Sequence, residues 1–175
     1  EKDGKESTLR IFKNRTEVDK VCLMKGEMPA DADEIAIDRM YAVNNEINVG
    51  DTISVDGIDY KVSGYVALSD YSALFQSNSD MMFDSVLFGV AVVTDERFDS
   101  FDLDFMHMSY AWTYDEEPKD KKEEKEVSDD LAKVISRYGE LETFVPRYAN
   151  QAINFTGDDM GSDTVMVETM LYILI

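Results

Sequence analysis

The chain has 175 residues, of which 44% are hydrophobic and 31% are charged. This composition is typical of a folded globular protein and argues against a disordered acidic tail. Acidic residues number 37 against 17 basic ones, and the net charge of −20 repels nucleic-acid phosphates and anionic lipid headgroups. We therefore expect no nucleic-acid partner. The same charge attracts cationic partners, or it serves solubility alone.

The first part of the chain predicts short strands and one short helix. A strand is expected over residues 9–12, a loop over 25–30, where Gly and Pro occur, and a second strand over 34–37. Asp38 is suited to cap a helix over 39–44, because an Asp carboxylate accepts hydrogen bonds from the first free backbone N–H groups of a helix.

The clearest local pattern is a β-hairpin. Residues 52–55 and 58–66 alternate polar and apolar side chains, as half-buried strands do. Asp56-Gly57 between them is a preferred two-residue turn. Gly64, inside the second strand, predicts a bulge or a close approach of another backbone.

The remainder predicts an irregular loop with a helical turn, followed by alternating strands and helices. The loop covers residues 68–83, and strands are expected over 88–94, 105–114 and 143–145. Helices are expected over 95–101, over 119–138 and after a cap at Ser162 or Asp163. Strands and helices interleave without regular βαβ spacing, so we predict an α+β fold with a mixed, mostly antiparallel sheet.

No residue pattern predicts catalysis. His107 is the only histidine and Cys22 the only cysteine, and the sequence gives no reason for the two to meet. Cys22 lies in the apolar run of residues 21–24, which favours a buried, unreactive thiol. The scattered glycines form no phosphate-binding loop. We therefore predict no catalytic, cofactor-binding or metal-binding residue, and no enzyme activity.

Two acidic clusters would allow at most weak, incidental calcium binding: Asp99, Asp102 and Asp104, and Asp158, Asp159 and Asp163. Neither has the alternating ligands, central Gly and distal Glu of a calcium loop. A carboxylate-based hydrolase stays open, but with 37 acidic residues the sequence singles out no pair.

Aromatic and methionine side chains gather in the middle of the chain. They form either a soft contact surface or core packing under the loop, and they are Tyr65, Tyr71, Phe75, Met81, Met82 and Phe83.

The last six residues, 170–175, are all apolar. They are too few to span a bilayer, which needs about 20 residues. They are consistent either with the first turns of a membrane span or with a short buried element.

Several segments, taken in order, resemble the extracellular domains of FtsX-like ABC-transporter permeases, the group that includes MacB. The segments are Gly26-Glu27-Met28-Pro29, then Asp33 to Asp38, then Ile47-Asn48-Val49-Gly50-Asp51-Thr52-Ile53, then Lys61 to Val66, and more distantly Phe144-Val145-Pro146-Arg147. Asn44-Asn45 depart from the apolar residue expected before the helix exit, and the N-terminal part shows no match.

The resemblance implies two lobes on the extracellular or periplasmic side of the cell membrane. Residues 1–20 and 105–175 would form a membrane-proximal α/β lobe leading into a transmembrane helix, and residues 21–104 an inserted β-rich lobe. It also implies a cytoplasmic ATPase subunit as partner. A second permease copy is a further expected partner, and the net charge of −20 favours a cationic or peptide substrate. The implied function is to relay ATP-driven motion to the outside. The alternative is a secreted acidic module that binds cationic peptides.

Overall fold

The structure, a computed structural model, describes residues 6–77, 79–102, 109–151 and 154. The chain divides into two compact units, Glu1–Ala111 and Trp112–Ile175, called here the sheet unit and the helix unit. The predicted strand over 143–145 is wrong, because these residues form no strand. Residues 109–114 form none either, while 105–108 and the predicted terminal helix lie outside the described residues.

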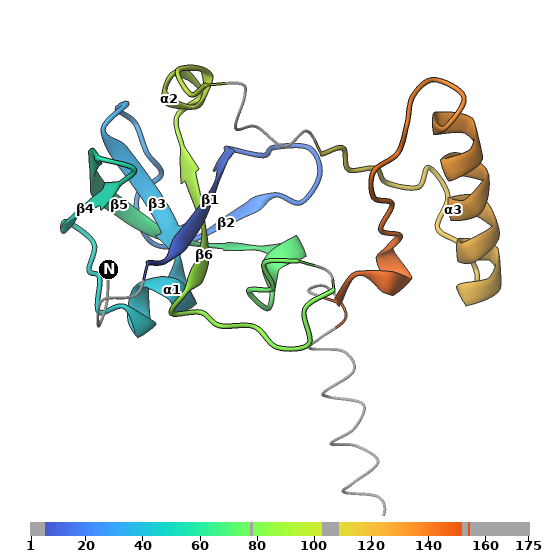
Figure 1. Cartoon of the computed structure of the whole chain (residues 1–175), viewed down its shortest axis with the longest axis horizontal. Coiled ribbons are helices and arrows are strands. Elements are labelled where there is room, and N and C mark those ends of the chain that lie inside the picture. The colour runs from blue at the N-terminus through green and yellow to red at the C-terminus, as the bar shows by residue number, and fades with distance from the viewer. Residues whose placement is uncertain (1–5, 78, 103–108, 152–153, 155–175) are drawn as a thin grey trace, which may run out of the picture. The chain divides into compact units, whose positions relative to one another are not determined.

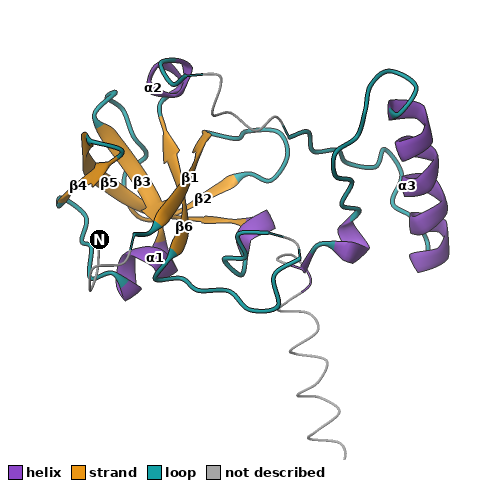
Figure 2. Ribbon diagram, in the orientation of Figure 1, coloured by secondary structure: helices purple, strands orange, loops and turns teal. Residues whose placement is uncertain are grey.

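The sheet unit contains a mixed six-stranded sheet (Figures 1 and 2). Its strands are β1 (Thr8–Lys13), β2 (Val21–Gly26), β3 (Glu34–Asp38), β4 (Thr52–Val55), β5 (Ile58–Leu68) and β6 (Phe88–Val93). They are ordered β1-β6-β3-β5-β2, and β4 also pairs with β5. Of the strand pairings within the described residues, β1–β6 and β3–β5 are parallel, and β2–β5, β3–β6 and β4–β5 are antiparallel. The predicted α+β class with a mixed sheet is confirmed.

The division into units differs from the expected lobes. The expectation joined residues 1–20 to residues 105–175, but β1 pairs in register with β6 along its whole length, from Thr8 opposite Phe88 to Lys13 opposite Val93. The first strand therefore belongs to the same sheet as β2–β6.

The core of the sheet unit is apolar and is centred on β3, β5 and β6. All six residues of β6 are buried, which is expected of a strand covered on both faces. Figure 1 shows α1 (Arg39–Asn44) beside the start of β6 and α2 (Asp95–Asp99) after its end. The larger side chains that are almost fully buried are Ile35, Ile37, Tyr60, Val62, Val66, Leu68, Leu74, Val90, Val92 and Val93.

Glycines allow two close approaches in this core. A Cβ at Gly89 would meet the Tyr41 side chain of α1 at 2.5–2.8 Å, so the missing side chain lets α1 pack on β6. Gly26 and Gly64 face each other across β2 and β5. A Cβ at Gly64 would lie 2.5 Å from the Glu27 carbonyl oxygen and 2.7 Å from that of Lys25. The close backbone approach predicted at Gly64 is confirmed.

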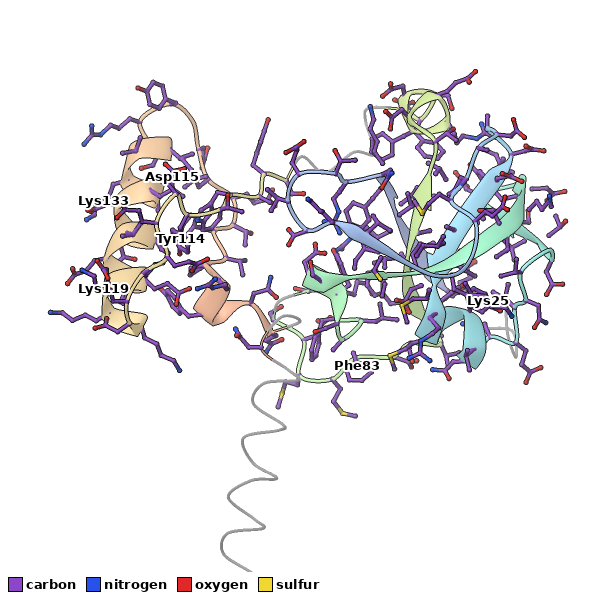
Figure 3. All side chains as sticks on the ribbon, turned by 180° about the vertical axis from the view of Figure 1, so that it is seen from behind. Lys25, Phe83, Tyr114, Asp115, Lys119 and Lys133 are labelled. Carbon is purple, nitrogen blue, oxygen red and sulfur yellow. The ribbon has the colours of Figure 1, made fainter. Side chains whose placement is uncertain are left out.

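The helix unit is built around α3 (Lys121–Ile135), with a short 3-10 turn, η3, at Arg147–Ala149. Asp120 caps α3 by accepting hydrogen bonds from the backbone N–H groups of Lys122 and Glu123. The predicted helix over 119–138 is thus confirmed with a later start and an earlier end. Figure 3 labels Tyr114, whose hydroxyl lies 3.0 Å from the hydroxyl of Ser128 on α3.

Candidate functional site

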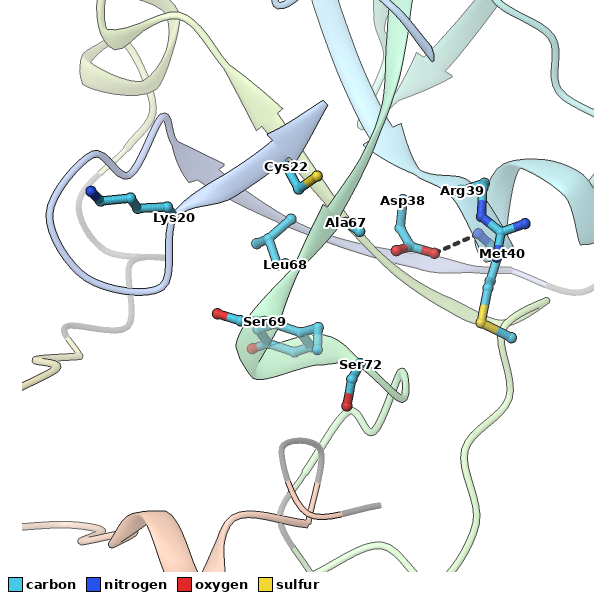
Figure 4. A pocket seen from close by; sticks show the side chains of 10 residues that line it. Lys20, Cys22, Asp38, Arg39, Met40, Ala67, Leu68, Ser69 and Ser72 are labelled. Carbon is cyan, nitrogen blue, oxygen red and sulfur yellow. Dashed lines mark hydrogen bonds between the residues drawn. The ribbon is translucent and has the colours of Figure 1, made fainter. Parts of the chain in front are cut away.

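A cavity of about 340 Å³ opens on the sheet unit (Figure 4). It lies where the start of β2, the junction of β3 with α1, and the end of β5 meet the 3-10 turn η1 (Ser69–Tyr71). The helical turn expected in the 68–83 loop is this η1. The residues that line the cavity are Lys20, Cys22, Asp38, Arg39, Met40, Ala67, Leu68, Ser69, Tyr71 and Ser72.

Asp38 is the buried polar residue of this cavity, with 5% of its surface exposed. Its Oδ1 atom accepts hydrogen bonds from the backbone N–H of Met40 at 2.7 Å and of Tyr41 at 3.1 Å, so the predicted N-cap is confirmed. The Oδ2 atom accepts no hydrogen bond from the described residues. Burial raises the pKa of the Asp38 carboxyl, although the two backbone N–H donors and the nearby Arg39 act in the opposite direction.

Two arginines fix the wall that η1 contributes. Arg15 binds Asp70 with two parallel hydrogen bonds, at 2.8 and 2.7 Å, the geometry in which a guanidinium and a carboxylate interact most strongly. Arg10 donates to the Tyr71 hydroxyl at 2.7 Å and to the Gln76 carbonyl oxygen at 2.9 Å. These contacts tie η1 to β1 and to the loop that follows β1, and hold Tyr71 in place at the cavity.

The rim carries exposed polar groups. Lys20 and Arg39 are exposed, and neither forms an ion pair within the part of the chain that the structure describes. Figure 4 shows the Lys20 side chain extending away from the cavity. Cys22 is exposed, so the expectation of a buried thiol is wrong. The reason is that residues 21–26 form strand β2 at the edge of the sheet, where the side chains from Cys22 to Gly26 are exposed.

The two candidate acidic clusters do not form a site in the described residues. Asp99 forms an ion pair with Lys13 at 2.5 Å. His107, Asp104, Asp158, Asp159 and Asp163 lie outside the described residues. No group of three His, Cys, Asp or Glu side chains that could hold a metal ion occurs in the part of the chain that is described.

The aromatic and methionine cluster separates into two groups. Tyr65 and Phe75 are buried, and Tyr71 packs against Phe12 with ring centroids 5.7 Å apart. Met81 and Met82 are instead 96% and 84% exposed. Core packing thus accounts for part of the cluster, and the two methionines project from the loop before β6.

The cavity combines mainly apolar walls with a few polar groups, of which the Asp38 carboxylate is buried, and this is the composition of a small binding site. The sequence indicated Asp38 only as a helix cap. Nothing in the local pattern shows that β2 and η1, which lie many residues away along the chain, would line a cavity together with it.

The chain matches no protein-family model, no curated protein and no solved structure. The resemblance to FtsX-like permeases therefore rests on the quoted motifs alone. Within the described residues, no helix is both long enough and apolar enough to cross a bilayer.

Proposed function

We propose that this chain is an extracellular part of an ABC-transporter permease of the FtsX-like type, which relays ATP-driven motion across the membrane and carries out no catalysis itself. Its partners would be a cytoplasmic ATPase subunit, a second permease copy, and a substrate or protein outside the membrane. The observation that supports the proposal is that three of the resembling segments meet the fourth, Lys61 to Val66, which is a short stretch of β5.

The first two segments meet β5 through its backbone. Gly26 pairs with Gly64, and the Glu27 N–H donates to the Ser63 carbonyl oxygen at 3.0 Å. On the other side of β5, strand β3 runs parallel, with Ala36 opposite Gly64 and Ile37 opposite Tyr65.

The third segment, around Val49-Gly50-Asp51, is fixed to the same stretch. The Gly50 N–H donates to the Val62 carbonyl oxygen, and the Val62 N–H donates to the Asp51 carbonyl oxygen, both at 2.8 Å. The Tyr65 hydroxyl donates to the Ile47 carbonyl oxygen at 2.7 Å. The segments, all between residues 26 and 66, thus share one set of contacts, as is expected of motifs that together build one structural element.

These contacts are mainly backbone hydrogen bonds and close packing, which stiffen a domain and perform no chemistry. A stiff domain can transmit a displacement from one end to the other without deforming. The absence of enzyme activity is part of the proposal and rests on this structural character of the motifs.

Cys22 offers a direct test of location, because it is the only cysteine of the chain and is exposed. The complete gene product would be expressed in bacterial cells and treated with a membrane-impermeant maleimide. We expect labelling of intact cells to equal that of lysed cells. We also expect the protein to remain in the membrane fraction and an ATP-hydrolysing subunit to co-purify with it in detergent.

Cys22→Ser is the matched control, because it removes the thiol at an exposed edge position and reveals any labelling elsewhere in the gene product. Labelling only after lysis, or a gene product found in the soluble fraction, would contradict the proposal.

A stand-alone acidic module that binds cationic peptides is the second candidate, favoured by the charge of −20. Titration with basic peptides over a salt series distinguishes it, because screening weakens electrostatic binding as salt rises. Binding that is absent or independent of salt would remove this candidate.

A further inference from the structure

The Asp38 carboxylate has no counter-charge of its own. It is 5% exposed, it forms no salt bridge with the described residues, and its two hydrogen bonds both reach Oδ1. A buried charge is costly unless it is paired, and this one is balanced by only two backbone N–H groups and by an arginine too distant for an ion pair. Oδ2 is left as an acceptor without a donor among the described residues.

The free oxygen faces the cavity. Figure 4 shows Oδ1 directed at the backbone of Met40, while the other oxygen points toward the side of the cavity formed by Ala67 and Leu68. The Asp38 and Leu68 side chains that border the cavity are themselves buried, so the site is already formed without a ligand.

Much of the cavity lining is apolar. Met40, Ala67, Leu68 and Tyr71 line the cavity together with Ser69 and Ser72. A volume of about 340 Å³ is at the lower end of the range of roughly 300–1,000 Å³ found for small-ligand sites. Such a cavity suits a short hydrocarbon chain with one cationic end.

We propose that this cavity binds an alkylammonium group, such as a lysine side chain of a cationic peptide. The ammonium donates a hydrogen bond to Asp38 Oδ2, and the methylene groups lie along Met40, Leu68 and the Tyr71 ring. A planar aromatic ring beside an ammonium adds attraction from its π face.

The surrounding charge favours a cation over an anion. The chain carries −20 overall, and an anion would meet the Asp38 carboxylate in the cavity lining. Lys20, the cation on the β2 side of the rim, is directed away from the cavity. Arg39 is exposed, so water screens its repulsion of a bound ammonium.

This inference goes beyond the proposed function, because it assigns a ligand class to a defined cavity and does not depend on the permease assignment. If Cys22 labelling places the chain inside the cell, the cavity can still bind an amine. If the cavity binds no amine, the permease proposal is unaffected.

The test is an NMR titration of the isotope-labelled chain with n-pentylammonium chloride at about 150 mM NaCl, a physiological ionic strength, with pentan-1-ol as the uncharged probe of equal chain length. We expect saturable shifts of the backbone amide signals of residues 38–40 and 67–72 with the amine, and at least tenfold weaker binding of the alcohol.

Asp38→Asn is the decisive variant, because Asn caps a helix about as well as Asp and so preserves α1. We expect it to weaken amine binding at least tenfold. Asp59→Asn, an exposed carboxylate on β5, makes the same change in net charge and should leave binding unchanged. Shifts that do not saturate, that spread over the acidic surface, or that are equal in the Asp38→Asn variant would overturn the proposal.

Discussion

The two units of this chain are stabilised in different ways. In the sheet unit, the buried side chains are almost all apolar, and most of them come from the paired strands. In the described part of the helix unit, the buried residues are Glu124, Ser128 and Pro146. The apolar side chains at helical spacing on α3 stay exposed to a considerable extent, including Val127 at 44% and Val134 at 47%.

Polar contacts hold α3 in the helix unit, whereas apolar contacts hold the sheet in the sheet unit. Glu124 accepts a hydrogen bond from Arg147 at 3.3 Å, and Ser128 meets Tyr114. The Trp112 and Phe144 rings stack with centroids 5.1 Å apart. Electrostatic contacts at half-exposed groups are weak and sensitive to salt, whereas apolar burial is not. We therefore expect the sheet unit to be the more stable of the two.

Replacing a core side chain gives the largest expected effect. Ile37 is fully buried, so Ile37→Ala should lower the free energy of unfolding by about 3 kcal/mol, from lost burial and a residual cavity. Val134→Ala on α3 is the control, and its effect should stay within about 0.5 kcal/mol. Urea unfolding followed by circular dichroism measures both changes in the free energy of unfolding. Equal changes would contradict the difference between the two units.

The glycines give the second test. Gly64→Ala adds a Cβ against the carbonyl oxygens of Lys25 and Glu27, which belong to the backbone and cannot move aside easily. We expect a loss of about 2 kcal/mol in the free energy of unfolding. A Cβ at Gly139 would meet no atom within 4 Å beyond its chain neighbours, so Gly139→Ala should be nearly neutral. A tolerated Gly64→Ala would show that the β2–β5 contact is adjustable.

The Arg147–Glu124 pair tests the helix unit. Glu124 is 8% exposed, so Arg147→Ala leaves a buried carboxylate without this partner. Because Arg147 itself is about half exposed, we expect a modest loss of about 1 kcal/mol. Fluorescence of Trp112, the only tryptophan, reports on this unit. Arg147→Lys, which keeps the charge, should recover part of the loss, and failure to do so would assign the effect to packing.

The carboxyls of Glu34 and Asp38, at the two ends of β3, should change the stability of the fold with pH in opposite directions. Both effects should be smaller than those of the substitutions above. The hydrogen bond from the Ala30 N–H lowers the pKa of Glu34, so its stabilising contribution is present above the unfolded pKa of about 4.3 and disappears as pH falls through the folded value. Burial raises the pKa of Asp38, so its contribution is complete below about pH 3.9 and is lost as pH rises through the folded value.

Melting temperatures of Glu34→Gln and Asp38→Asn, measured from about pH 3 to about pH 7 so that both carboxyls titrate, give this difference. Relative to the unsubstituted chain, Glu34→Gln should become less stable as pH rises, and Asp38→Asn more stable. If the melting-temperature differences of the two variants changed with pH in the same direction, the opposite pKa shifts of Glu34 and Asp38 would be contradicted.

Local patterns predicted the elements that depend on local chemistry. The Asp56-Gly57 turn, the Asp38 cap and the charged face of α3 each specify a conformation through nearby residues, and all three occur in the structure. Strand β2 was missed because an edge strand needs no alternating pattern. Its side chains are mostly exposed, and it ends at Gly26, which has a φ of 75°. A glycine at this position makes the sequence look like that of a loop.

The candidate site was less predictable than the fold. Asp38 was identified as a cap, but its role in the cavity depends on β2 and η1, which reach it through non-local pairing. The Arg15–Asp70 and Arg10–Tyr71 contacts join residues 55 and 61 positions apart. No spacing rule links such residues, so only the folded chain brings them together.

Native-state hydrogen exchange of the 175-residue chain tests most directly whether the two units are held differently. We predict that the buried amides of β5 and β6 exchange only through global unfolding. Their opening free energy should therefore equal the free energy of unfolding measured in urea. The α3 amides should exchange through local opening of lower free energy, reduced further by Arg147→Ala. Equal opening free energies for α3 and β6, both insensitive to Arg147→Ala, would show that the two units are stabilised in the same way.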